Sequence, residues 1–137
     1  MVPLIFADSS AWYALSDERD ADHDAASRFF QTSMRRETGR LATTDYVMDE
    51  TLTLLRARRG LPAAHQLASL VDSSPNVELV WVGEERYRQA LELMMSYRDK
   101  EWSFTDCTSF VVMRELGIGD AFTFDANFQQ AGFEIHP

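Results

Sequence analysis

Four acidic residues of this 137-residue chain occupy positions where carboxylates are uncommon. Asp8 and Asp125 each end an apolar run, and Glu50 and Asp106 interrupt apolar stripes of helical spacing. A carboxylate held against apolar surroundings loses its hydration, so a cation, hydrogen bonds or a basic partner must replace the water. Clustered carboxylates also repel one another, and a hard divalent ion such as Mg²⁺ or Mn²⁺ removes that repulsion through oxygen ligands. These residues therefore indicate metal-dependent chemistry.

Three of these acids also have a purely local explanation. Asp106 and Ser103 fit the S-x-x-D form of a helix capping box. Asp8 could cap the helix that follows it, and Asp125 could begin an Asx-turn before Asn127. Each local role stays open beside a role as metal ligand, although independent caps have no reason to converge on one point.

Glu50 is the acid without a capping role. It lies three residues after Val47 and four before Leu54, which places it on the inward stripe of its helix. An inward carboxylate in the middle of a helix needs a partner. Besides a metal ion, the alternative partner is Arg56 or another nearby arginine.

Apolar periodicity predicts strands that alternate with helices along the chain. We expect strands at residues 2–7, 41–43, 77–82, 121–124 and 133–135, with the strand at 77–82 fully buried. We expect helices from an N-cap at residue 9 or 10, at 22–34, from 44 or 45 to 60, and at 62–72, 84–97 and 103–117. This alternation predicts an α/β fold with a mainly parallel sheet covered on both faces, and ligands bind such sheets at the carboxyl ends of the strands. Asp8 and Asp125 should meet there.

The composition indicates one compact domain over residues 1–137. The hydrophobic fraction is 45%, and no apolar stretch approaches the ~20 residues of a membrane span, so we expect a cytoplasmic protein. Methionine, tryptophan and phenylalanine side chains are assigned to the core. Tyr87, Leu91 and Met94 form the apolar stripe of the helix at 84–97. Cys107, the one cysteine, is expected as a buried thiol.

The net charge of −9 excludes a protein that coats nucleic acid through a broad basic surface. The positive charge is almost all arginine and forms two groups, which are Arg35, Arg36 and Arg40, and Arg56, Arg58 and Arg59. Arginine suits bidentate contact with phosphate, but charges at helix ends or on a solvated face explain the groups equally well. Whether either group binds phosphate stays open.

Other metal and catalytic sites have little support in the sequence. Asp20, Asp22 and Asp24 open like a calcium loop, yet Ala25 replaces the required glycine and Gln31 the bidentate glutamate. These acids are therefore assigned to a solvated helix start. The histidines lie outside the acidic segments and are assigned to the surface; they are His23, His65 and His136.

Four segments carry the unusual acids, and together they span nearly the whole chain. They are D-S-S at 8–10, D-E-T at 49–51, S-F-T-D-C-T-S-F at 103–110 and F-D-A-N-F at 124–128. In this order and spacing they resemble the PIN-domain ribonucleases, and most closely the VapC-type toxins of toxin–antitoxin modules. The resemblance implies a three-layer α/β/α sandwich with Asp8, Glu50, Asp106 and Asp125 as the metal-binding acids. Asn127 is a departure, because some relatives carry a further acid there.

The resemblance also implies a function. Members of the family use Mg²⁺ or Mn²⁺ to cut RNA, often form homodimers, and are inhibited by a small DNA-binding antitoxin whose tail covers the site. Because water is the expected nucleophile, the products should carry a 5'-phosphate and a 3'-hydroxyl. Polar groups beside the acids are assigned either to positioning of water or phosphate or to packing and capping; they are Ser9, Thr105 and Asn127.

Two other classes of function stay open. A phosphoacceptor receiver domain shares the acidic crevice and the parallel sheet, but it needs a lysine after a strand, and Lys100 lies before a helix. A PIN-like fold that binds RNA or protein without cutting is the second alternative. Cleavage of RNA that requires magnesium and stops with a chelator would favour the nuclease over both.

Overall fold

The computed structural model describes residues 4–35 and 39–137. Five strands in these residues form one sheet with the order β3-β2-β1-β4-β5, and every pairing is parallel. The strands are β1 (Leu4–Ala7), β2 (Arg40–Thr44), β3 (Val77–Val80), β4 (Asp120–Phe122) and β5 (Glu134–His136). Residues 2 and 3 of the first expected strand, and Arg36, lie outside the described residues.

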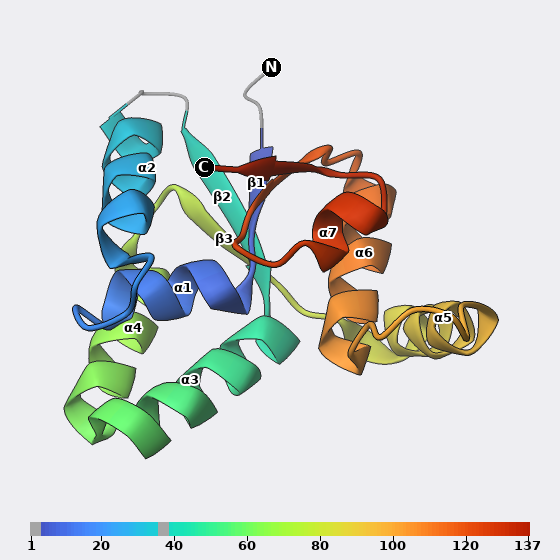
Figure 1. Ribbon diagram of the computed structural model, residues 1–137, viewed down its shortest axis with the longest axis horizontal. Helices are drawn as coiled ribbons and strands as arrows, with labels where there is room; N and C mark the ends of the chain where they lie inside the picture. The colour runs from blue at the N-terminus through green and yellow to red at the C-terminus, as the bar shows by residue number, and fades with distance from the viewer. Residues whose placement is uncertain (1–3, 36–38) are drawn as a thin grey trace.

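Seven helices cover the sheet in the described part of the chain. They are α1 (Ser9–Ser16), α2 (His23–Arg35), α3 (Asp45–Arg59), α4 (Leu61–Ser73), α5 (Gly83–Ser96), α6 (Phe104–Leu116) and α7 (Asn127–Gln130). Figure 1 shows α1, α2 and α4 on one side of the strands and α5, α6 and α7 on the other, with α3 contacting both α1 and α6. The predicted three-layer α/β/α arrangement is confirmed. No helix of residues 4–35 or 39–137 is long and apolar enough to cross a membrane.

Helix ends follow short-range sequence signals. Thr44 caps α3 through its hydroxyl, and Ser103 caps α6, as expected. Gly117 ends α6 in the left-handed conformation, with φ of 69°, which a residue with a side chain rarely adopts. For α1 the sequence left two alternatives, a cap at residue 9 or 10 and a cap at Asp8, and the structure confirms the second. Asp8 caps this helix, because its carboxylate accepts from the backbone N–H of Ser10 at 3.4 Å.

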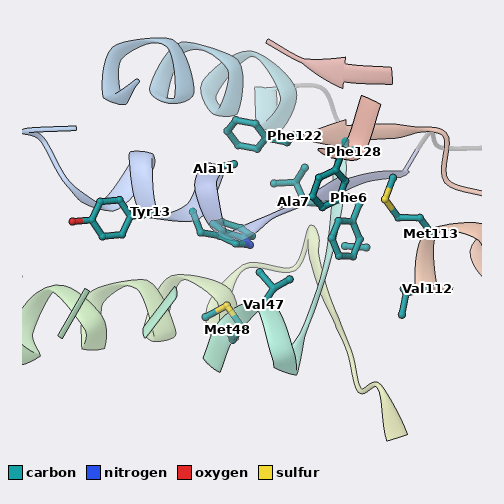
Figure 2. Close-up of a cluster of buried hydrophobic side chains, with 14 of the residues drawn as sticks. Phe6, Ala7, Ala11, Tyr13, Val47, Met48, Val112, Met113, Phe122 and Phe128 are labelled. Atoms are coloured by element: carbon teal, nitrogen blue, oxygen red, sulfur yellow. The ribbon is translucent and has the colours of Figure 1, made fainter. Parts of the chain in front are cut away.

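The core lies between the sheet and the helices. Phe6 of β1 and Phe128 of α7 stack with ring centroids 6.4 Å apart, and Figure 2 shows them against each other. Phe110 of α6 meets Phe128 edge to face at 5.0 Å. On the other side, the buried indole of Trp12 donates to Thr43 Oγ1 at 3.1 Å. Burial of each such aromatic contributes roughly 1.5–3 kcal/mol, so β1 and the residue after it are held firmly.

The expectation of a fully buried strand at 77–82 was wrong. β3 ends at Val80 and lies at an edge of the sheet, with only β2 beside it. Its side chains are therefore half-buried or exposed, and Glu78 pairs with Arg40 of β2 at 3.0 Å. An apolar run in the sequence does not distinguish an edge strand from a central one, because the difference depends on which strands pair.

The assignment of apolar residues to the core holds only in part. Trp12 is buried and so is Cys107, but the Trp81 side chain is 68% exposed. Tyr87, Leu91 and Met94 of α5 are exposed as well, at 37–43%, so the apolar stripe of this helix lies at the surface. α5 packs against α6 through another face, on which Ala90 is fully buried.

Candidate active site

The chain order of the strands reverses beside β1. The chain runs outward from β1 through β2 to β3 and then returns to β4 on the other side of β1. Such a switch leaves a crevice at the carboxyl ends of the two central strands. Asp8 follows β1 directly, Asp125 follows β4, Glu50 lies in the second turn of α3, and Asp106 lies in the first turn of α6. All four line one pocket of about 460 Å³.

A network of hydroxyl groups fixes the carboxylate of Asp8. Ser10 Oγ and Thr123 Oγ1 both donate to Asp8 Oδ2, at 3.1 and 3.0 Å. Thr123 Oγ1 also accepts from the backbone N–H of Asp125 at 3.0 Å, which turns the chain out of β4. For this reason β4 ends at Phe122, two residues earlier than expected. Among the residues that the structure describes, Asp8 Oδ1 receives one longer contact of 3.4 Å, from Ser9 Oγ.

Burial dominates the electrostatics of Asp8. Its side chain is almost inaccessible, with 2% relative exposure. Loss of hydration, and secondly the negative charge of Asp106, raise the pKa of Asp8 from its ordinary value of 3.8 to about 6. Hydrogen bonds to the carboxylate offset part of this rise. A nearby cation would compensate for the lost hydration of Asp8 and for its repulsion by Asp106.

Asp106 combines a capping role with a position in the pocket. Ser103 Oγ accepts from the Asp106 backbone N–H at 3.0 Å, and the Ser103 backbone N–H donates back to Asp106 Oδ2 at 3.2 Å. Asn127 Nδ2 donates to the same oxygen at 3.2 Å. Burial is the main cause that raises the pKa of Asp106, and the charge of Asp125 adds to it.

Glu50 has no basic partner among the described residues, since none of their ion pairs includes it. The alternative partner, Arg56, is exposed at the end of α3. Burial raises the pKa of Glu50, followed by the charge of Asp106, while the hydroxyls of Thr105 and Ser9 lower it. The half-buried carboxylate of Glu50 therefore still lacks a positively charged partner among the described residues.

Local roles and a pocket role coexist because each carboxylate has two oxygens. Asp125 forms the expected Asx-turn, in which its Oδ1 accepts from the Asn127 backbone N–H at 2.9 Å. Asp106 and Asp8 direct their hydrogen bonds mainly to Oδ2. Among the described residues, Asp106 Oδ1 and Asp125 Oδ2 receive no hydrogen bond. Oxygen atoms without a protein partner, on a buried and a half-buried carboxylate, fit a hard divalent cation.

The polar residues named beside the acids fall into two groups. Ser9 and Asn127 line the pocket, whereas Thr105 is not among the described residues that line it. Sequence reasoning missed Thr123 and considered Ser10 only as a helix cap, although both hold Asp8. Their position two residues from Asp8 and Asp125 is a weak signal, because hydroxyls near strand ends are common in turns.

Three further acids line the pocket. They are Asp20 and Asp22, which were assigned only to a solvated helix start, and Glu101, which was not singled out. The only basic side chain among the described lining residues is Arg58. Of the other arginines, Arg59 pairs with Asp17 at 3.5 Å, so part of this group serves the structure of the fold.

A separate group of metal-ligand types lies elsewhere on the sheet. Potential ligand atoms of Asp120, Glu134 and His136 lie within 4.8 Å of one another. Asp120 and Glu134 begin β4 and β5, at the opposite end of the strands from Asp8. His136 Nε2 lies 3.0 Å from Asp120 Oδ1, and none of the three lines the pocket.

The assignment of all histidines to the surface was partly wrong. His65 is exposed, but His136 is half-buried and its ring stacks on Phe29 at 5.7 Å. His23 is also half-buried, and its Nδ1 lies 2.7 Å from the backbone oxygen of Ala14. Tertiary packing of α2 creates both environments.

Comparison with known proteins identifies the family. The PIN-domain model matches residues 5–134. The chain belongs to the PIN-domain family. The 23S rRNA-specific endonuclease VapC20 of Mycobacterium tuberculosis is 38% identical to this PIN domain over 135 residues, which cover 98% of this chain and 99% of that one. A VapC ribonuclease of Archaeoglobus fulgidus is 30% identical over 122 residues, covering 88% and 76% of the two chains.

Solved structures support the same assignment. The crystal structure of VapC20 superposes on this PIN domain with a TM-score of 0.88 at 37% identity, covering 97% of this chain and 99% of that one. FitAcB of Neisseria gonorrhoeae, at 11% identity with a TM-score of 0.66, covers 97% and 96% of the two chains and supports the fold alone. The resemblance to VapC-type PIN nucleases is confirmed, and the protein is a nuclease of this group.

Proposed function

We propose that this PIN-domain protein is a magnesium- or manganese-dependent endoribonuclease and the toxin of a toxin–antitoxin pair. One observation carries the proposal. Asp8, Glu50, Asp106 and Asp125 line a single pocket, with carboxylate oxygens that have no protein partner and no ion pair to Glu50 among the described residues. A cation offsets both the lost hydration and the mutual repulsion of the carboxylates in a pocket of this kind.

In the proposed site, Asp8 and Asp106 are the first ligands of the ion, and Glu50 and Asp125 complete the acidic set. When bound, Mg²⁺ or Mn²⁺ lowers the pKa of an attacking water and offsets charge that develops on the phosphoryl oxygens. Ser10 and Thr123 hold Asp8 in place through the hydrogen bonds to its Oδ2. These bonds fix the orientation of the Asp8 carboxylate, and with it the direction of Oδ1.

The neutral polar groups have a supporting role in this proposal. Asn127 orients Asp106 through its amide, and Ser9 and Thr105 lower the pKa of Glu50 and favour its ionised form. The same groups are suited to position water or a phosphate oxygen. With water as the nucleophile, the products carry a 5'-phosphate and a 3'-hydroxyl.

We further propose a loop of ribosomal RNA as the substrate. The relative with 38% identity over nearly its whole length is a 23S rRNA-specific endonuclease, and its crystal structure describes a toxin that cleaves the sarcin-ricin loop. Loops suit sequence-selective recognition because their bases are unstacked and accessible. The other RNA classes are then poor substrates.

Two protein partners belong to the same proposal. The acidic pocket attracts a basic peptide, so a cognate antitoxin with an arginine- or lysine-bearing tail is the proposed inhibitor. A homodimer is proposed on the apolar surface near α5, where the side chains of Trp81 and Met95 are 68% and 63% exposed. Size-exclusion chromatography with light scattering, on the wild type and Met95→Glu, tests the dimer. A wild-type protein that is monomeric in solution would contradict the proposed homodimer.

The function is tested by cleavage of purified ribosomes and of total RNA, with Mg²⁺, with Mn²⁺ and with EDTA, followed by mapping of the new ends. We expect discrete cuts in ribosomal RNA, 5'-phosphate ends, and no cutting by Asp8→Asn or by the wild type in EDTA. Cyclic phosphate ends or cutting in EDTA would contradict the metal-dependent mechanism. RNA binding without cleavage would indicate a non-catalytic domain.

A further inference from the structure

The pocket is strongly acidic, and one basic side chain interrupts it. Seven of the described residues that line the pocket are acidic. Among all the described lining residues, only Arg58 carries a positive charge. An RNA strand carries a negative charge at every phosphate, so these carboxylates repel it. A cation at the acidic end and Arg58 are therefore the attractive points that a strand meets in the pocket.

Arg58 lies on the same face of α3 as Glu50. Glu50, Leu54 and Arg58 follow one another at intervals of four residues, and all three line the pocket. Along the helix axis, Arg58 is about 12 Å from Glu50. This backbone separation favours contact of Arg58 with a phosphate that flanks the one beside the carboxylates.

The partner of the Arg58 side chain is an aromatic ring and not an acidic residue. The Arg58 guanidinium carbon lies 5.3 Å from the ring centroid of Tyr13. Tyr13 is 8% exposed, and its hydroxyl donates to Asp17 Oδ2 at 2.7 Å, so the ring itself is fixed. Asp17 in turn pairs with the neighbouring Arg59.

This arrangement leaves N–H donors of Arg58 available. Among residues 4–35 and 39–137, the Arg58 side chain takes part in no ion pair, and its polar contact is with Tyr13, whose pKa it lowers. A guanidinium has five N–H donors, so a contact with an aromatic ring still leaves donors for bidentate contact with a phosphate. Arg56, in the same helical turn, is exposed but does not line the pocket.

We propose that Arg58 binds a phosphate of the RNA that flanks the scissile one, and so selects which stretch of the strand lies across the carboxylates. This role rests on the proposed ribonuclease function. Arg58 is a substrate-binding residue in this proposal, and Tyr13 is the positioning residue that orients it.

Steady-state cleavage of an RNA oligonucleotide over a series of salt concentrations tests the role. For Arg58→Ala we expect KM to rise roughly tenfold, the loss of one charged hydrogen-bonding contact, with kcat unchanged. The slope of log KM against log salt should fall by about 0.7, the loss of one phosphate contact on a single strand. Arg58→Lys should restore the slope but only part of KM, and Arg56→Ala, the matched control, should change neither.

Three outcomes would overturn the proposal. They are equal effects of Arg58→Ala and Arg56→Ala, a loss of kcat at unchanged KM, and weaker binding of the antitoxin with RNA kinetics unchanged. Binding of labelled RNA, measured by anisotropy in the Asp106→Asn background, adds a readout that needs no cleavage. If the wild type cuts no RNA, the ribonuclease function fails, while the comparison of Arg58 with Arg56 in binding still decides the role of Arg58.

Discussion

The side-chain amide of Asn127 donates a hydrogen bond to Asp106 Oδ2 at 3.2 Å, joining the start of α7 to the first turn of α6. A neutral donor thereby contacts a buried carboxylate in a pocket that is lined by seven acidic residues among those described. The bond favours the ionised form of Asp106 and leaves Oδ1 of that residue without a partner among the described residues. Asn127 thus stabilises the ionised form of Asp106, which is the form that binds a metal ion.

Asn127→Asp should make the stability of the protein depend on metal. The new carboxylate would face Asp106 in place of a donor, and loss of a charged hydrogen bond alone costs roughly 1.5–3 kcal/mol. We expect the free energy of unfolding in EDTA to fall by at least this amount and to recover with Mg²⁺. Urea unfolding measures both values. Asn127→Ala is the control, because it removes the bond without adding charge, and equal recovery of both variants would contradict the explanation.

The buried position of Asp8 should make the metal-free protein more stable in mild acid. Its pKa is about 6 in the folded protein against an ordinary 3.8, so the folded state binds the proton more tightly than the unfolded chain. Ionised Asp8 therefore lowers the free energy of unfolding by on the order of 3 kcal/mol above about pH 6. This loss is relieved as the pH falls from about 6 toward 4. Urea unfolding in EDTA near pH 5 and near pH 7 measures it.

Asp8→Asn isolates this contribution. The amide keeps the shape of the side chain and removes its charge, so the variant should lose most of the pH dependence and gain stability near pH 7. Asp72→Asn, on the exposed face of α4, is the matched control and should leave the dependence unchanged. A pH dependence that survives Asp8→Asn in full would show that other groups cause it.

The protein has two groups of residues that could bind a metal ion, the acids of the pocket and the group on β4 and β5. A metal titration of variants distinguishes between them. We expect Mn²⁺ affinity to fall at least tenfold in Asp106→Asn, since even residues behind the ligands cost that much in metal sites. Asp120→Asn removes the equivalent charge from the Asp120, Glu134 and His136 group and should leave the affinity unchanged. Calorimetry with each variant measures it. The reverse pattern would move the metal site to β4 and β5.

Ser103→Ala should separate the stability of α6 from the chemistry of the pocket. Loss of the capping hydroxyl costs about 1 kcal/mol. The backbone N–H of Ser103 and the amide of Asn127 still hold Asp106 Oδ2, so cleavage should persist. Thermal unfolding and RNA cleavage measure the two effects. Ser96→Ala, at the exposed end of α5, should cost less than 0.5 kcal/mol, and a Ser103→Ala protein that is stable but inactive would contradict the prediction.

The sequence alone determined the features that depend on neighbouring residues. The caps at Thr44 and Ser103 and the end of α6 at Gly117 each involve residues within one turn of the helix, so local pattern was sufficient. The alternation of strands and helices then set the parallel sheet. The four acids could be found from the sequence because carboxylates rarely occur within apolar segments, where burial would remove their hydration.

Only the tertiary structure decided the features that depend on pairing between distant segments. The position of β3 at the sheet edge and the exposure of Leu91 on α5 follow from which elements lie next to each other. The hold of Thr123 on Asp8 spans most of the chain. Arg58 reaches the pocket because α3 runs along it, above the ring of Tyr13. Long-range packing fixes these contacts, and no pattern within one segment encodes them.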